Sequence, residues 1–123
     1  MTLASPRSII GVLICLLISP LATAKPVNHV VLVWLKAEIS VEQRNTIMQA
    51  GLQLQNIPGV ISVHTGLPVA SDRAIVDDSF SFGITIELPD ANAINSYLEH
   101  PIHVNYVATH IKHSAEKLLI YDF

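Results

Sequence analysis

The nine residues from Phe80 to Leu88 constrain the fold more than any other stretch of the sequence. Phe80, Phe82, Ile84, Ile86 and Leu88 are apolar, and they alternate with smaller or polar residues. Alternation with a period of two is typical of a β-strand that packs one face on a core and leaves the other face more polar. The stretch therefore predicts a strand of an antiparallel sheet.

Three further strands are predicted, over residues 29–36, 60–66 and 116–123. The first is a near-continuous apolar run, as in a strand covered on both faces, and it places His29 and Val33 on the same face. One helix and one polar loop lie between the first three of the four predicted strands. The loop, residues 67–79, is either a lid over a pocket or a surface loop, because both would be polar and irregular.

The helix is predicted to begin after Ser40, because Ser40 and Gln43 have the spacing of a capping box. It stops at Pro58 and Gly59. Gly51 lies in the middle of this helix, where glycine costs about 1 kcal/mol relative to alanine. It therefore indicates close packing or space left for another group.

The segment Tyr97-Leu98-Glu99-His100-Pro101-Ile102-His103 is predicted to form a corner between two short helical arms. Pro101 has no amide hydrogen and disfavours helical geometry at His100, so one arm ends there and a second begins. Tyr97 closes the first arm and His103 opens the second. Both side chains can therefore be directed into one hollow.

The two arms have predicted limits and a predicted inner face. Asp90 is expected to cap the first arm, and the second arm is expected to run from Pro101 to about His113. The residues of the second arm that are predicted to face inward are Val104, Val107, Ala108 and Ile111.

The predicted order is strand, helix, strand, strand, split helix, strand. Two βαβ halves of this kind give a ferredoxin-like α+β fold, a four-stranded antiparallel sheet with the helices on one face. The other face still carries apolar residues that water would not cover. Pairing two sheets into a dimeric α+β barrel would bury them, so the predicted partner is a second copy of the chain.

Residues 1–24 have the plan of a secretory signal peptide. Arg7 is followed by an apolar run over residues 9–18, then by Pro20 and by the small residues 22–24, which form a cleavage site. The apolar run is about half the roughly 20 residues that a spanning helix needs. The sequence predicts cleavage after Ala24, export to the periplasm or the medium, and no membrane attachment afterwards.

The expected mature chain, residues 25–123, is one domain. Seven basic residues less Arg7 leave six against ten acidic ones, a net charge of −4. No basic patch is present to follow phosphates, which argues against nucleic acid as a partner. The single cysteine, Cys15, is removed with the signal peptide, so no disulfide is expected.

The chain resembles the stress-responsive A/B barrel (Dabb) family over nearly the whole expected mature length. The resemblance is carried by His29, Ile57-Pro58-Gly59-Val60, Gly66, the corner from Tyr97 to His103, and the segment from Glu116 to Asp122. It implies a dimeric ferredoxin-like barrel. The family includes plant stress and antifungal proteins and a plant polyketide cyclase that forms olivetolic acid.

The resemblance to that cyclase implies roles for three residues. A histidine matching His103 is its general base, a tyrosine matching Tyr97 holds the substrate carbonyl, and a histidine matching His29 lies beside them. A neutral imidazole can take an acidic α-proton, and a phenol can donate to the resulting enolate oxygen. An aromatic pocket residue of the cyclase falls on Gly51, and another falls near Ser114 and Ala115, so the pocket walls differ.

The predicted ligand is a small apolar or aromatic molecule, bound between sheet and helices without a cofactor. Besides Tyr97 and His103, the residues predicted to contact it are His29, Val33, Met48, Ile84 and Ile86. The alternative is a non-catalytic stress or interaction protein, in which hydrogen bonds of Tyr97 and His103 only tie the two arms together.

The histidine spacing also raises the question of a metal site. His100 and His103 are three positions apart, as are His110 and His113. Zinc needs three or four converging ligands, and no cysteine or clear carboxylate partner is available in the expected mature chain. No metal site is therefore predicted, and neither a phosphate-binding glycine loop nor a serine nucleophile motif occurs.

Overall fold

The structure is a computed structural model that describes residues 1–2, 19 and 23–123. The predicted signal peptide, residues 1–24, falls mostly on residues outside this description. Within the described ranges, no helix combines the length and the apolar character needed to cross a bilayer.

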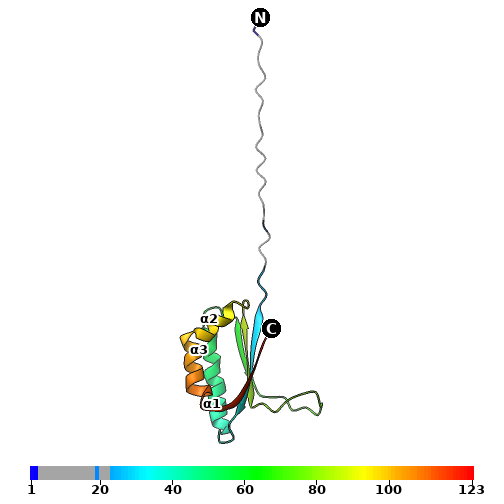
Figure 1. Ribbon diagram of the computed structural model, residues 1–123, viewed down its shortest axis with the longest axis vertical. Helices are drawn as coiled ribbons and strands as arrows, with labels where there is room; N and C mark the ends of the chain where they lie inside the picture. Colours follow the sequence, from blue (N-terminus) through cyan, green and yellow to red (C-terminus); the bar gives the residue numbers. More distant parts are fainter. Residues whose placement is uncertain (3–18, 20–22) are drawn as a thin grey trace.

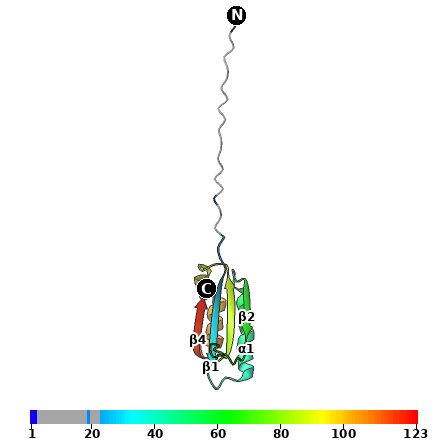
Figure 2. The ribbon, with the colours of Figure 1, turned by 90° about the vertical axis from the view of Figure 1, so that its right-hand side faces the viewer.

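The described chain folds into one four-stranded antiparallel sheet (Figure 2). Its strands are β1 (Val27–Leu35), β2 (Ser62–Gly66), β3 (Phe82–Leu88) and β4 (Ala115–Asp122), in the order β2-β3-β1-β4. In the centre of the sheet Val31 pairs with Ile84 of β3 and with Ile120 of β4. The first strand is therefore central, and the last strand of the chain forms one edge.

The helices all cover the same face of the sheet (Figure 1). They are α1 (Val41–Gly51), which continues as the 3₁₀ turn η1 (Leu52–Asn56), then α2 (Ala93–Glu99) and α3 (Pro101–Tyr106), which continues as the π-helical turn η2 (Val107–Ile111). This arrangement confirms the predicted ferredoxin-like α+β fold.

The start of α1 confirms the predicted capping box. The Ser40 hydroxyl accepts a hydrogen bond from the Gln43 amide at 3.1 Å, and the Gln43 side-chain oxygen accepts one from the Ser40 amide at 2.8 Å. At the other end of α1, a Cβ on Gly51 would lie only 3.1 Å from the Tyr106 hydroxyl oxygen. Gly51 therefore marks close packing of α1 on α3, one of the two predicted possibilities.

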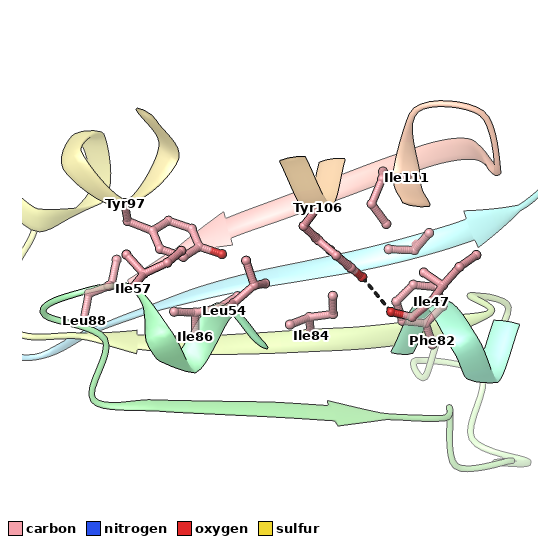
Figure 3. Close-up of a cluster of buried hydrophobic side chains, with 11 residues drawn as sticks. Ile47, Leu54, Ile57, Phe82, Ile84, Ile86, Leu88, Tyr97, Tyr106 and Ile111 are labelled. Carbon is pink, nitrogen blue, oxygen red and sulfur yellow. Dashed lines mark hydrogen bonds between the residues drawn. The ribbon is translucent and has the colours of Figure 1, made fainter. Parts of the chain in front are cut away.

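Strand β3 shows the predicted alternation, and its inward residues form the floor of the core (Figure 3). Phe82, Ile84, Ile86 and Leu88 are all buried. Phe80 differs from the prediction. It precedes β3 and lies over the other face of the sheet, with its ring centroid 6.3 Å from that of Trp34.

The reason for this difference lies in Ser81. Its amide donates to the Val33 carbonyl at 2.7 Å, and its hydroxyl accepts from the Leu35 amide at 2.9 Å. The hydroxyl thus takes a bond that a backbone carbonyl would accept in a regular ladder. The chain leaves the pleat before Phe82, so the alternation does not extend to Phe80.

The inner face of the second arm is also shifted from the prediction. Val104 is 54% exposed and Ala108 is exposed, whereas Tyr106 and Ile111 are buried. In η2 the Lys112 amide bonds to the Val107 carbonyl five residues back, and such a π turn changes the phase that a regular 3.6-residue repeat assumes. The prediction was therefore right for Val107 and Ile111 and wrong for Val104 and Ala108.

Candidate functional site

The predicted corner is present, and a histidine stabilises it. Helix α2 ends at Glu99, His100 has extended backbone angles (φ −64°, ψ 137°), and Pro101 opens α3. The His100 Nδ1 atom accepts a hydrogen bond from the Ile102 amide at 3.2 Å, so His100 caps α3. Such a cap satisfies one of the free amides of a helix start.

The corner brings Tyr97 and His103 together, although they belong to different helices. Their ring centroids are 4.8 Å apart, and the rings are tilted by 54°. His29, at the start of β1, places its ring centroid 5.5 Å from that of Tyr97 in an edge-to-face arrangement. The structure thus brings the three predicted polar site residues into one cluster.

His29 is 3% exposed, and its imidazole is held by the opposite end of the chain. Its Nδ1 atom lies 2.6 Å from the Oδ1 atom of Asp122. Asp122 is the last residue of β4 and pairs with His29 across the sheet. An ionised carboxylate can only accept, so Nδ1 carries the proton in this contact. Asp122 thereby fixes the ring of His29 beside Tyr97.

Tyr97 is 3% exposed, and its ring extends from α2 toward the sheet (Figure 3). Burial, with a smaller contribution from Tyr106, raises the pKa of the Tyr97 phenol above its ordinary value. The side chain therefore stays protonated and keeps a hydroxyl that can donate to a ligand.

His103 is partly buried, and its Nδ1 atom lies 2.9 Å from the Leu98 carbonyl oxygen. Because a carbonyl only accepts, Nδ1 carries the proton. Burial lowers the pKa of the His103 imidazole below its ordinary value, the bond to Leu98 opposes this, and the charge on His29 adds to the lowering. At neutral pH the ring is therefore neutral, and Nε2 is an unprotonated base.

These three side chains face a cavity of about 230 Å³ between the sheet and the helices. Of the predicted contact residues, His29, Val33, Ile84 and Ile86 line it, together with Tyr97 and His103. Met48 lies elsewhere, half-buried against the core. The remaining wall is almost entirely apolar and consists of Val31, Leu54, Leu98, Tyr106, Val107, Ile111, Leu118 and Ile120.

Sequence reasoning missed two polar residues of this region. Asp122 was recognised only as part of the last segment, yet an antiparallel pairing of the first and last strands places it opposite His29. Tyr106 was overlooked because the predicted inner face of the second arm included the next residue, Val107, and not Tyr106 itself. Its hydroxyl donates to the Ile47 carbonyl at 3.1 Å, and burial raises its pKa (Figure 3).

The histidines do not gather into a metal site in the part of the chain that the structure describes. No group of three or more histidine, cysteine, aspartate or glutamate side chains is placed there to hold an ion. His110 instead lies against the Tyr106 ring, with 5.5 Å between the centroids.

The sequence model of the stress responsive A/B barrel domain, Dabb, matches residues 27–123. The chain belongs to this family. No curated protein matches the chain. The match covers all four strands and all helices of the described fold.

Solved structures with this fold include three that are instructive. A Dabb family protein from Mesorhizobium loti is 28% identical, with a TM-score of 0.62, and the match covers 80% of this chain and 94% of that one. A hydroxynitrile lyase from Passiflora edulis is 20% identical, with a TM-score of 0.68 and coverage of 80% and 92%. A dimeric ferredoxin-like protein from Bacteroides fragilis is 18% identical, with a TM-score of 0.62 and coverage of 80% and 94%.

Proposed function

We propose that this Dabb domain binds a small apolar or aromatic molecule in the cavity between sheet and helices, and that His103 and Tyr97 act on it as base and hydrogen-bond donor. The observation that carries the proposal is the convergence of three polar rings on an otherwise apolar cavity. An apolar pocket with a few placed polar groups is the usual form of a small-molecule site.

The protonation states support acid-base chemistry. His103 offers an unprotonated Nε2 atom because its Nδ1 proton is bound to Leu98. Tyr97 offers a phenolic proton that burial retains. A carbonyl compound with its oxygen at Tyr97 and an acidic C–H at His103 would lose that proton to Nε2, while the phenol stabilises the enolate oxygen.

The size of the cavity limits the ligand. An apolar cavity of about 150 Å³ holds benzene, and this one has about 230 Å³. A single aromatic ring with a short substituent therefore fits, and a larger molecule would have to extend through the opening. The hydroxynitrile lyase among the similar structures shows that this fold can carry an enzyme.

The proposal is tested with acetophenone, which combines one ring, a carbonyl and exchangeable α-protons. Saturable binding is followed by protein NMR, and exchange of the methyl protons for deuterium is followed in the ligand spectrum. His103→Gln is expected to abolish protein-catalysed exchange and to leave binding within a few-fold. Tyr97→Phe is expected to slow exchange by about 10²-fold, in the range for loss of one such donor.

His64→Gln is the control, because His64 is exposed on β2 and does not line the cavity. It should leave binding and exchange unchanged. If His103→Gln and Tyr97→Phe alter only thermal stability, while binding and exchange persist, the catalytic assignment is wrong. If acetophenone and other neutral single-ring compounds do not bind at all, the ligand proposal is wrong as well.

We also propose that the protein is a homodimer in which two sheets pair through the faces that lack helices. The supporting features are the uncovered face with Trp34 and Tyr121, and Val69 and Ile75, which are 84% and 90% exposed on the loop that extends on the same side (Figure 1). The protein from Bacteroides fragilis is dimeric. A monomer at micromolar concentration in sedimentation equilibrium would contradict this proposal.

Export remains part of the proposed function. Cleavage after Ala24 would place the domain in the periplasm or outside the cell, because the first residues have the plan of a signal peptide. N-terminal sequencing of the protein recovered from its own host tests this. A mature chain that still begins at Met1 would contradict it.

A second candidate is a non-catalytic stress or interaction protein with a structural corner. Two bonds favour it, because His100 caps α3 and His103 bonds to the Leu98 carbonyl, and both hold the corner without any ligand. On this hypothesis His103→Gln lowers the midpoint of thermal unfolding and has no further effect. The acetophenone experiment separates the two candidates.

A further inference from the structure

A second cavity lies at the other end of the four-stranded sheet from Tyr97 and His103. It has a volume of about 440 Å³ and lies where β1 ends, α1 begins and the loop over residues 67–81 joins the sheet. It shares no lining residue with the cavity of Tyr97 and His103. Its chemistry therefore has to be judged from its own walls.

Arg44 is the unusual member of this cavity. Its Nε atom is enclosed by protein atoms and has no hydrogen-bond partner among the described residues. The one side-chain bond of its guanidinium is a long one, 3.4 Å from Nη2 to the Asn45 side-chain oxygen. A desolvated donor without an acceptor is costly and calls for an explanation, such as a bound anion.

The rest of the cavity adds positive potential and no negative charge. Lys36 is one of the residues that line it. Its ammonium group donates one hydrogen bond to the His113 carbonyl, at 2.9 Å, and has two further N–H donors. Ser40 and Val41 bring in the start of the 11-residue helix α1, whose dipole favours an anion. Glu38 and Glu42 belong to the same segment but do not line the cavity.

The other walls are apolar. The apolar residues that line the cavity are Leu35, Ile39, Leu67, Pro68 and Phe80. An inorganic anion would leave this surface unused, whereas an anion with an apolar body would cover it. The combination of a guanidinium fork, one ammonium group and an apolar wall suits a carboxylate on a small aromatic or aliphatic body.

We propose that this cavity is a second binding site, which takes a small aromatic or aliphatic carboxylate through Arg44 and Lys36. The carboxylate binds at the terminal guanidinium nitrogens, and a small rotation of the guanidinium brings Nε–H onto the second oxygen. The apolar body of the ligand lies against Leu35 and Ile39. This site goes beyond the acid-base function proposed above and does not depend on it.

The test uses 4-phenylbutyrate as the anionic probe and 4-phenylbutanol as its neutral counterpart, with the full-length protein. Calorimetry is expected to give saturable binding of the carboxylate and at least tenfold weaker binding of the alcohol. Amide NMR shifts are expected at Val41 and Phe80. Arg44→Gln should weaken carboxylate binding at least tenfold, Arg44→Lys less, and Lys36→Ala by a few-fold.

Two variants serve as controls. Arg73→Gln removes an exposed arginine outside the cavity and should leave the affinity unchanged. His103→Gln alters the first cavity alone and should also leave it unchanged, so failure of one proposal is distinguishable from failure of the other. The proposal is overturned if the carboxylate does not bind saturably, if Arg44→Gln and Arg73→Gln bind it equally, or if His103→Gln abolishes the binding.

Discussion

Gly51 and Tyr106 provide a quantitative test of the packing between α1 and α3. In Gly51→Ala the new Cβ would lie 3.1 Å from the Tyr106 hydroxyl oxygen and 3.4 Å from the Ile84 Cδ1 atom. Tyr106 is 6% exposed, so its ring cannot swing out to solvent. Its hydroxyl also bonds to the Ile47 carbonyl, one turn before Gly51 on the same helix. The methyl group therefore pushes directly on a hydrogen-bonded atom.

The expected magnitude follows from three terms. Overpacking of a core costs about 1–3 kcal/mol, and loss of the Tyr106 hydrogen bond costs about 1 kcal/mol. Alanine recovers up to about 1 kcal/mol of helix propensity relative to glycine. We therefore expect Gly51→Ala to lower the free energy of unfolding by about 1–3 kcal/mol, although alanine is the better helix former.

The same substitution should behave differently when the hydroxyl is absent. In a Tyr106→Phe background the nearest remaining contacts, to the ring and to Ile84, are at 3.4 Å, which is close to ordinary van der Waals distance. Gly51→Ala should then be neutral or stabilise by up to about 1 kcal/mol. The double-mutant cycle, measured by urea unfolding with circular dichroism, should give a coupling of about 1–4 kcal/mol.

Tyr121→Phe is the control for this cycle, because Tyr121 is 51% exposed and lies on the sheet face that lacks helices. Combined with Gly51→Ala it should be additive. If Gly51 and Tyr106 are also additive to within about 0.5 kcal/mol, the packing described for this contact is wrong.

Three further predictions concern the cap, the buried histidine and pH. Ser40→Ala should cost about 1 kcal/mol in urea unfolding through loss of the capping box, and an unchanged midpoint would contradict it. Asp122→Ala should cost about 1–3 kcal/mol because the Nδ1–H group of His29 loses its acceptor, whereas Asp122→Asn, which keeps an oxygen, should cost less. The lowered pKa of His103 means that the unfolded chain binds its proton more readily than the folded chain, so stability from this group is complete above about pH 6.5 and declines as the pH falls below it. The difference in unfolding free energy between wild type and His103→Gln should follow this decline, and a difference that grows on acidification would refute it.

The sequence was most informative where local chemistry decides the structure. The capping box at Ser40, the corner at Pro101 and the alternation from Phe82 to Leu88 depend on neighbouring residues, and all three are present. The Asp90 side chain accepts from the Ala93 amide at 3.0 Å, but regular helix α2 begins only at Ala93, so its N-cap is Asn92, which makes no side-chain cap bond. These elements were sufficient to obtain the fold class.

The errors occur where the outcome depends on helix phase or on distant contacts. Val104 was expected to face inward and is exposed, whereas Tyr106 is buried, because the arm ends in a π turn that no residue pattern indicated. Phe80 left the alternation because the hydroxyl of Ser81 bonds to β1. The role of Asp122 depends on the register between the first and last strands, which the residue pattern does not specify.

The pairing of β1 with β4 also determines when the cavity can form during folding. His29 and Asp122 are 93 positions apart in the chain, and β4 supplies both the partner of His29 and the cavity wall of Leu118 and Ile120. Closing so long a loop costs conformational entropy before the contacts between β1 and β4 stabilise the fold. A chain in which β4 has not yet paired therefore carries β1 with one edge exposed, and the cavity is incomplete until this pairing forms.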